Sequence, residues 1–486
     1  MTTAVVPADY MPALAEIWMM AMVCVTLLAG LFTKKDSSFT YLLSQLVLLG
    51  AAVCTWYSFI YYSGGASNVQ IFHHQYVMDV LSTILKLFIY LIVFVVFLYS
   101  RHYNRDRNIP PEYYILGLIS TLGMMILISA HNLLPIYMGI ELFSLPTYAM
   151  VALERRQGRC IEAAMKYFII GALASGILLY GMSLLFGMTQ SLDISTIAQH
   201  IVTMSDGQKI VMIVALVFVF AGVAFKFGAA PFHMWVPDVY EGASTSVTLF
   251  ISTAPKIAAF ALAIRLIVES MPEFRVVSQD IFIVLAVLSI AIGNFAALAQ
   301  DSIKRMLAYS SISHIGYMLL GFVAMTPRGD AAAMFYVITY AITTLVAFGM
   351  LAMLSRAGFE VDKIDDLRGL SGRNPWLAFV MLMSLFSMAG IPPFVGFIAK
   401  VGVLEALINT HFVWLAVYAL LFAIIGSYYY LRVVKTMYFE EPAVRTPLVC
   451  ALDSKIIMSL NGLAVVLLGI FPGGLFTMCH IAFASF

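Results

Sequence analysis

Four charged residues of this sequence stand inside long apolar stretches and have the chemistry needed to move protons. They are one carboxylate, Glu141, and three lysines, Lys226, Lys256 and Lys400. A charge near the centre of a membrane span costs about 2.5–3.5 kcal/mol on insertion scales, so it faces a bundle interior or a hydrated cavity. A lysine removed from water releases its proton more readily, and a neighbouring carboxylate reverses this effect. Lysines that gain and lose such a partner can carry protons.

Two apolar windows are interrupted by the same pattern, G-x-x-P-F. The glycines and prolines of these breaks are Gly228, Pro231, Gly390, Pro392 and Pro393. Proline removes a backbone donor and clashes with the preceding turn. Broken backbone at membrane depth is tolerated only where protein buries it or water fills a cavity. Lys226 precedes the first break and Lys400 follows the second, which indicates an ion path.

Two carboxylate–lysine pairs are expected. Glu141 must be protonated or have a cationic partner, because desolvation disfavours its charge, and Lys226 is the natural candidate. A purely structural ion pair is the alternative. Glu162 and Lys166 are four residues apart and share a helical face. They either form an interfacial ion pair, or Lys166 modulates the charge that Glu141 and Lys226 experience.

Two histidines are weaker candidates for an accessory relay. His314 lies in SSISHIGY and His233 in PFHMW. Each is either a hydrogen-bonded packing residue or a neutral imidazole that passes protons between lysines. Lys86 has no evident partner in the sequence and stays unassigned.

The composition is that of a membrane protein. Of 486 residues, 62% are hydrophobic and 11% charged, against about 25% charged in ordinary soluble domains. The net charge of +1 and the lack of a basic run argue against nucleic acid as a partner. We expect no metal site and no nucleotide cradle, because the cysteines are widely spaced and no glycine-rich motif is present. The five cysteines are Cys24, Cys54, Cys160, Cys450 and Cys479.

The elements that must position these residues are membrane spans of about 20 residues each. Fourteen apolar windows predict an all-α polytopic bundle: 11–33, 39–62, 76–99, 112–130, 132–152, 161–187, 210–240 (broken), 244–270, 279–300, 305–325, 331–355, 376–409 (broken), 412–439 and 455–478. The two broken windows are five spans apart, so they cross the membrane in opposite directions. Such a pattern is typical of an inverted repeat with the transport path beside each broken helix.

Basic residues predict the orientation. Most of the 27 lysines and arginines follow odd-numbered windows: Lys34, Lys35, Arg101, Arg105, Arg107, Arg155, Arg156, Arg159, Lys304, Arg305, Arg356, Lys363, Arg368, Arg373, Arg432, Lys435, Arg445 and Lys455. The opposite loops carry Lys209, Arg275 and Arg328, with Arg265 near a span end. Because basic loops stay in the cytoplasm, both termini are expected on the other side.

Five segments resemble the antiporter-like subunits of respiratory complex I: GIELFSLPTYAMVAL, EAAMKYFIIGALASGILLYG, FKFGAAPFHMWVPDVYEGA, IKRMLAYSSISHIGYMLLG and MAGIPPFVGFIAK. The resemblance covers about residues 110–440. Larger members of the family usually have histidine where this chain has Tyr240, and one of them has glutamate where this chain has Lys400. The family commonly has proline at Ser244 and Ser246, so the start of the eighth span is expected to differ.

The resemblance implies fourteen helices with two inverted five-helix repeats, each containing a broken helix. The expected divisions are 1–110 for spans 1–3, 111–275 and 276–440 for the repeats, and 441–486 for span 14. It implies a proton path of Glu141 paired with Lys226, Lys256 as central relay and Lys400 on the exit side, with His314 on the central axis. NAD, FMN, iron–sulfur clusters and quinone would belong to partner subunits, and other membrane subunits of complex I would be neighbours in a bacterial inner membrane.

Two other functions remain open at this point. A subunit of a multi-subunit cation/proton antiporter or membrane-bound hydrogenase shares the fold, although Tyr240 and Lys400 argue against it. A quinone-binding or structural scaffold is the second, although a scaffold has no use for four embedded charges along one path.

Overall fold

The computed structural model describes the chain except for residues 1–9, 33–36, 64–67, 356–358, 442–450 and 485–486. Four of the basic residues used for orientation, Lys34, Lys35, Arg356 and Arg445, lie outside the described part, as does Cys450. Within it, thirteen helices are long and apolar enough to cross a membrane. The protein is therefore an all-helical, multi-pass membrane protein.

The described helices follow the predicted windows closely. They are η1 (Met11–Ala13), α1 (Leu14–Phe32), α2 (Ser37–Ser63), α3 (Val80–Asp106), α4 (Glu112–Ser129), α5 (Leu133–Val151), α6 (Gly158–Thr189), α7 (Ile194–Val202), α8 (Asp206–Phe227), α9 (Trp235–Gly242), α10 (Thr245–Ile251), α11 (Ala254–Ala263), η2 (Ile264–Glu269), η3 (Pro272–Phe274), α12 (Arg275–Leu298), α13 (Ile303–Val323), α14 (Pro327–Leu354), η4 (Ile364–Leu367), α15 (Leu370–Arg373), α16 (Pro375–Ala389), α17 (Val395–Asn409), α18 (Val413–Phe439), α19 (Leu452–Ile470) and α20 (Gly473–Phe483). One short hairpin, β1 (Val69–Ile71) and β2 (Tyr76–Met78), pairs antiparallel with Val69 opposite Met78.

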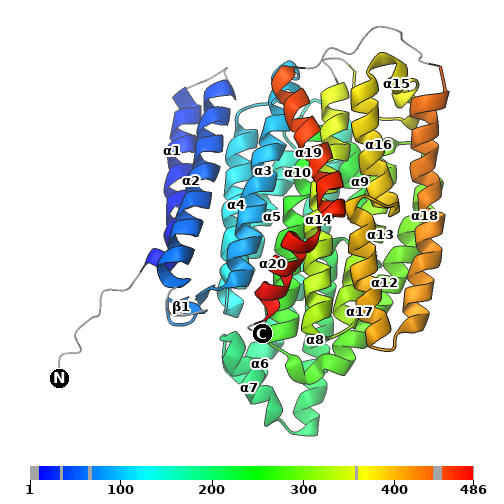
Figure 1. The fold of residues 1–486 in the computed structure, drawn as a ribbon. Coiled ribbons are helices and arrows are strands. Elements are labelled where there is room, and N and C mark those ends of the chain that lie inside the picture. Colours follow the sequence, from blue (N-terminus) through cyan, green and yellow to red (C-terminus); the bar gives the residue numbers. More distant parts are fainter. Residues whose placement is uncertain (1–9, 33–36, 64–67, 356–358, 442–450, 485–486) are drawn as a thin grey trace.

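The helices stand side by side in one bundle (Figure 1). The α1–α2 pair lies at one edge and α18 at the other, while α14 runs through the middle and packs against α3, α10, α11, α13, α16, α17, α19 and α20. Most of α14 is buried, and so is the Thr245–Glu269 span apart from the partly buried Val268 and Glu269 at its end. Helices buried all round must be apolar all round, which is why these windows show little amphipathic pattern.

The two predicted breaks are present where the G-x-x-P-F patterns stand. Helix α8 ends at Gly228, which has φ +71°, and α16 ends at Gly390, which has φ +84°. Only glycine adopts this left-handed backbone without steric cost, so both helices end there. The chain resumes as α9 at Trp235 and as α17 at Val395.

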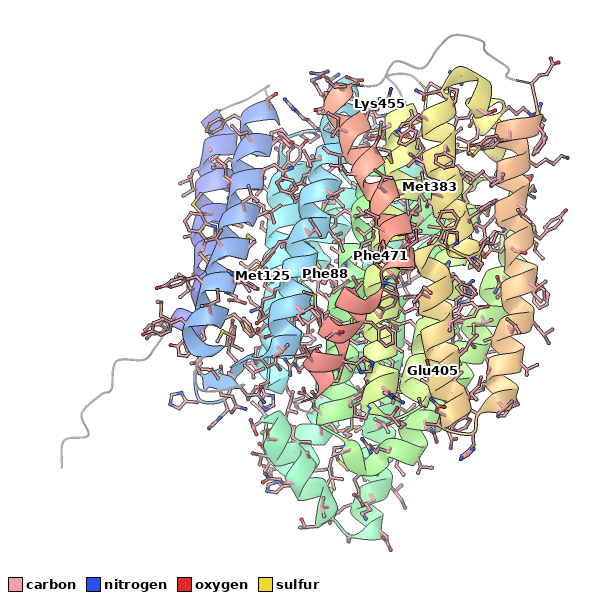
Figure 2. All side chains as sticks on the ribbon, in the orientation of Figure 1. Phe88, Met125, Met383, Glu405, Lys455 and Phe471 are labelled. Carbon is pink, nitrogen blue, oxygen red and sulfur yellow. The ribbon has the colours of Figure 1, made fainter. Side chains whose placement is uncertain are left out.

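Two further windows, predicted to be continuous, are also broken. The window 244–270 contains α10 and α11, which are separated at Ser252 and Thr253, followed by the π-helical turn η2. The last window contains α19 and α20, and Phe471 between them lies about midway along the bundle, below Lys455 at its upper end (Figure 2). A proline follows each break, Pro255 in the first turn of α11 and Pro472 before α20. Proline is tolerated in a first turn but not in a helix interior, which is the physical reason for both corrections.

The two serines at the start of the eighth window stand at positions whose backbone also suits proline. Ser244 precedes α10 with φ −58°, a value that proline itself adopts. Ser246 is the second residue of α10, where the backbone N–H has no intrahelical acceptor. Serine and proline therefore fit the same backbone at both positions.

Candidate functional site

Lys256 binds the end of the first broken helix. Its side chain is 1% exposed, and its Nζ donates a hydrogen bond to the carbonyl oxygen of Phe227 at 2.6 Å. Phe227 is the last residue of α8, directly before Gly228. The Lys256 ammonium also lies 5.4 Å from the centre of the Trp235 ring, in the first turn of α9.

Lys400 makes the corresponding contact at the second break. Its Nζ donates to the carbonyl oxygens of Met388 and Ala389, at 3.1 and 3.0 Å, and it is 8% exposed. Ala389 is the last residue of α16, directly before Gly390. The ring centre of Tyr317 is 4.9 Å from the Lys400 nitrogen.

Both lysines thus use the same chemistry. The last carbonyls of a helix lack intrahelical partners and carry the negative end of the helix dipole. This end favours an ammonium group, whereas removal from water disfavours it. A buried lysine held between these opposing effects is suited to exchange its proton.

The predicted pair of Glu141 and Lys226 is not closed into a direct ion pair in the described structure. Lys226, 8% exposed, donates to the hydroxyl oxygens of Ser144 at 2.8 Å and Ser175 at 3.5 Å. Ser144 lies one turn after Glu141 on α5, and Oε1 of Glu141 is buried without a hydrogen-bond partner among the described residues. The Ser144 hydroxyl therefore stands where the sequence predicted the carboxylate.

His314 is held between two tyrosines in the second half of the bundle. Its Nδ1 is 2.7 Å from the Tyr336 hydroxyl and its Nε2 is 3.0 Å from the Tyr430 hydroxyl. A cavity of about 10 Å³ beside it is lined in part by Met388, whose carbonyl accepts from Lys400. This is roughly the space that one water needs.

Several buried hydroxyls lie among these groups without a hydrogen bond of normal length and angle in the described part of the chain, although Ser311 faces both Tyr240 and Tyr340. They are Tyr240 Oη on α9, Ser311 Oγ on α13 and Thr344 Oγ1 on α14. The Tyr240 ring also packs at 6.3 Å from the Trp235 ring that faces Lys256. Buried hydroxyls are almost always hydrogen-bonded, and where the protein provides no partner, a buried water does.

Among the described residues, the accessory candidates Glu162 and Lys166 pair with groups other than the three buried lysines. Lys166 forms an ion pair with Glu162 at 2.9 Å, which is one of the two predicted alternatives. It also pairs at 2.9 Å with Asp238, and Asp238 in turn pairs with Arg305. These groups are partly exposed. His233 is partly exposed, between the exposed side chains of Phe232 and Met234, and its Nδ1 is buried without a hydrogen-bond partner in the described part of the chain.

Two buried ion-pair groups were not predicted. Lys86, left without a partner, pairs with Glu16 across α1 and α3, and its Nζ is 2.9 Å from the Tyr76 hydroxyl. Arg265, treated as a loop charge, is 2% exposed and binds Asp79 at 2.7 Å and Glu269 at 2.6 Å. The spacing of Arg265 and Glu269, four residues apart, was the available signal for the second group.

A third unpredicted group surrounds Glu360, in the segment after α14. Lys304, counted among the cytoplasmic loop charges, is only 2% exposed in its side chain and pairs with this carboxylate. Burial acts to raise the pKa of Glu360, but the charge and hydrogen bond of Lys304 outweigh it, so the pKa lies below its usual value. The carboxylate is therefore ionised at neutral pH.

No group of three or more histidine, cysteine or acidic residues in the described ranges is arranged to hold a metal. Four cysteines in those ranges are free thiols.

The sequence also matches a known family over most of its length. The family model described as "NADH:quinone oxidoreductase/Mrp antiporter, TM" covers residues 130–426. An NADH-quinone oxidoreductase subunit N from Coxiella burnetii is 58% identical over 98% of this chain and 99% of that protein. The chain belongs to the NADH-quinone oxidoreductase subunit N family.

Solved structures agree with membership in the subunit N family. A chain of respiratory complex I from Thermus thermophilus is 29% identical, with a TM-score of 0.81 over 95% of this chain and 98% of that one. A chain of the Mrp complex from Dietzia sp. is 20% identical, with a TM-score of 0.85 over 98% and 97% of the two chains, and shows a shared fold. That chain of the Mrp complex thus has the same fold, while the subunit N family membership rests on sequence.

Proposed function

We propose that this chain carries protons across a bacterial inner membrane as subunit N of complex I, through Glu141, Lys226, Lys256 and Lys400. The observation that supports this most is the matched pair of contacts at the two breaks. Lys256 and Lys400 are both buried, and each donates to the final carbonyls of a half-helix. A scaffold gains nothing from two such costly charges, whereas a proton relay needs them.

The first lysine supplies the switch in this scheme. Lys226 now rests on Ser144 rather than on Glu141, one helical turn away. Movement of α5 against α8 would exchange the neutral hydroxyl for a carboxylate. A carboxylate favours the ammonium form and a hydroxyl does so far less. Such an exchange would load or unload Lys226 and pass its proton toward Lys256.

Hydrated hydroxyls connect the later sites. Ser311 lies one turn before His314 on α13 and faces Tyr240, whose ring packs against the Trp235 ring beside Lys256. The small cavity at His314 is lined in part by Met388, whose carbonyl binds Lys400. Protons pass along hydrogen-bonded hydroxyls and waters without movement of heavy side chains. His314 therefore acts as the intermediate between the two lysines, while His233, Glu162 and Lys166 lie outside this route.

Two inverted five-helix repeats, 111–275 and 276–440, account for the paired breaks, with residues 1–110 and 441–486 added at the ends. The helix pairs α4–α5 and α12–α13 support this division. In the first pair a Cβ on Gly123 would lie 2.4 Å from the backbone of Phe143, and in the second a Cβ on Gly293 would lie 2.6 Å from that of Ser313. Glycine allows both pairs the same close backbone approach.

Fourteen crossings then place both termini on the non-cytoplasmic side. Figure 1 shows the end of α3 and helix α15 at the upper end of the bundle, and α7 at the lower end. The basic residues Arg105 and Arg373 belong to the two upper elements. The partners are the other membrane subunits of complex I. NADH oxidation with FMN and iron–sulfur clusters, and quinone reduction, take place on partner subunits, and this chain converts their signal into proton movement.

The proposed relay is tested with the variants Lys256→Met and Lys256→Arg in the assembled complex. Methionine cannot be protonated and guanidinium cannot release its proton, so both variants should lower NADH-driven proton uptake into inside-out vesicles at least tenfold. A gel should show the complex intact. Lys435→Met, at an exposed position of α18, is the matched control and should pump normally. Normal pumping by both Lys256 variants would refute the relay.

A further inference from the structure

A compact ion-pair group, which we call the Glu360 group, closes the upper end of the bundle. Oε1 of Glu360 accepts from Lys304, from the Tyr103 hydroxyl at 3.1 Å and from the Thr245 hydroxyl at 2.6 Å. Its Oε2 is 2.9 Å from Arg107. One carboxylate thus joins the end of α3, the start of α10 and the start of α13 (Figure 1).

The Glu360 group is buried but still touches solvent. The side chains of Glu360 and Arg107 are 16% and 12% exposed, whereas that of Lys304 is 2% exposed. The carboxylate therefore stands at the boundary between water and the bundle interior. A group in that position can exchange protons with bulk water, provided that its own charge is not locked.

The Glu360 group shares its elements with the unpartnered hydroxyls inside the bundle. Nζ of Lys304 is 3.3 Å from the carbonyl oxygen of Ala243, which connects α9 to α10. Helix α9 carries Tyr240, and α13 carries Ser311 seven residues after Lys304. Seven residues are two turns, so both side chains lie on one face of α13, about 10 Å apart along the axis. Lys304 thus stands at the outer end of this row.

The charged groups that face Glu360 within the described ranges come from several elements. Lys304 comes from α13, Arg107 from the end of α3, and Asp362 lies 3.7 Å from the Lys304 nitrogen. Glu154, after α5, has one buried oxygen without a hydrogen-bond partner in the described ranges. Burial raises the pKa of Glu154 although Arg107 opposes this. The two cations therefore hold Glu360 ionised, and Glu154 is the neighbouring acid that takes up a proton more readily.

We propose that Glu360 is the site where protons from the cytoplasm are taken up, and that its ion pair with Lys304 is the gate. This inference rests on the proposed relay and adds its cytoplasmic end. While Lys304 binds the carboxylate, no proton is accepted. When Lys304 withdraws, Glu360 takes a proton from water and passes it to the hydroxyls of Ser311 and Tyr240, and finally to the Lys256 amine. One proton moves at each step and no other bond changes.

A structural clamp is the competing explanation, because Glu360 also ties three helices together. The two differ in their dependence on pH. A clamp that is weakened lowers the rate of pumping at every pH. A gate that loses Lys304 lets Glu360 bind its proton at higher pH, because the opposite charge that kept it ionised is gone.

The test measures protons taken up per NADH oxidised by inside-out vesicles, as a function of external pH. Glu360→Gln should lower this ratio about tenfold, since an amide does not bind a proton reversibly, and Glu360→Asp should restore part of it. In Lys304→Met the alkaline limb of the profile should shift to higher pH, by about one pH unit or more. Glu440→Gln, which breaks the 2.9 Å pair with Arg368 on the same side, is the control and should change nothing.

The outcomes separate this inference from the relay itself. A Lys304→Met profile that keeps its position overturns the gate, and so does normal pumping by Glu360→Gln. If Glu360→Gln does not assemble on a gel, the Lys304→Met profile alone decides. Normal pumping by Lys256→Met would instead refute the relay, whereas loss of pumping in Lys256→Met with unaffected Glu360 and Lys304 variants would refute only the gate.

Discussion

The Lys400 ammonium nitrogen lies 3.0 Å from the carbonyl oxygen of Ala389, the residue at which α16 ends. The lysine belongs to the half-helix after the break and its acceptor to the half-helix before it. The break and the charge are therefore one unit. Movement of either half-helix changes the environment of the ammonium group directly. At the first break the carbonyl of Phe227 is also bound by a lysine, but Lys256 comes from α11 in the next span.

Removal of the Lys400 amine should stop pumping without loss of assembly. Lys400→Met keeps most of the stem volume and removes a charge that is costly in lipid, so a scaffold would tolerate it or gain stability. Lys400→Arg keeps the charge but cannot release its proton. We expect both variants to lose about tenfold or more of proton uptake, measured in vesicles beside a gel of the complex. Full pumping by both would show that Lys400 carries no protons.

The conformation of Gly390 should be as important as the lysine. A Cβ at this position would lie 2.9 Å from Cδ and 3.1 Å from Nζ of Lys400, and the left-handed backbone would add a cost of about 1–3 kcal/mol. Gly390→Ala should therefore displace Lys400 and reduce pumping several-fold.

The control is Gly402→Ala, two residues after Lys400 on the same helix. Its added methyl would meet Phe476 at 3.4 Å and Ala332 at 3.9 Å, both ordinary van der Waals contacts. Alanine is a better helix former by about 1 kcal/mol, so this variant should pump normally and be no less stable in a thermal assay. Equal effects of the two alanines would contradict a specific role of Gly390.

Glu141 should matter for pumping and little for packing. Its oxygen Oε1 has no hydrogen-bond partner in the described structure, so Glu141→Ala removes no hydrogen bond from that atom. We expect severe loss of coupled quinone reduction and proton uptake in an assembled complex, with a milder defect in Glu141→Asp. Normal proton uptake by Glu141→Ala would show that this carboxylate is not part of the proton path.

Cysteine labelling can test the orientation. Single cysteines at Arg105, Arg156 and Lys363, all exposed, should react with an impermeant reagent added from the cytoplasmic side. Cysteines at the exposed Gly207 and Arg328 should react from the opposite side. Both sets on the same side would rule out the fourteen-span topology.

Much of the fold follows from local sequence. A span needs about 20 apolar residues wherever it stands, so hydropathy located the helices. The breaks at Gly228 and Gly390 were visible because glycine and proline act on their own backbone. The breaks before Pro255 and Pro472 were missed, because a single proline inside an apolar window is compatible with either a helix boundary or a kink.

The sequence by itself also determined which residues are costly enough to require a function: Glu141, Lys226, Lys256 and Lys400. Only the tertiary structure decided what each of them touches. The sequence could not show that Lys226 rests on Ser144, since the two are 82 residues apart. Nor could it separate Lys304, buried against Glu360, from the exposed charges counted with it. The cost of a buried charge depends on its own type and depth, whereas its partner is fixed by how distant helices pack.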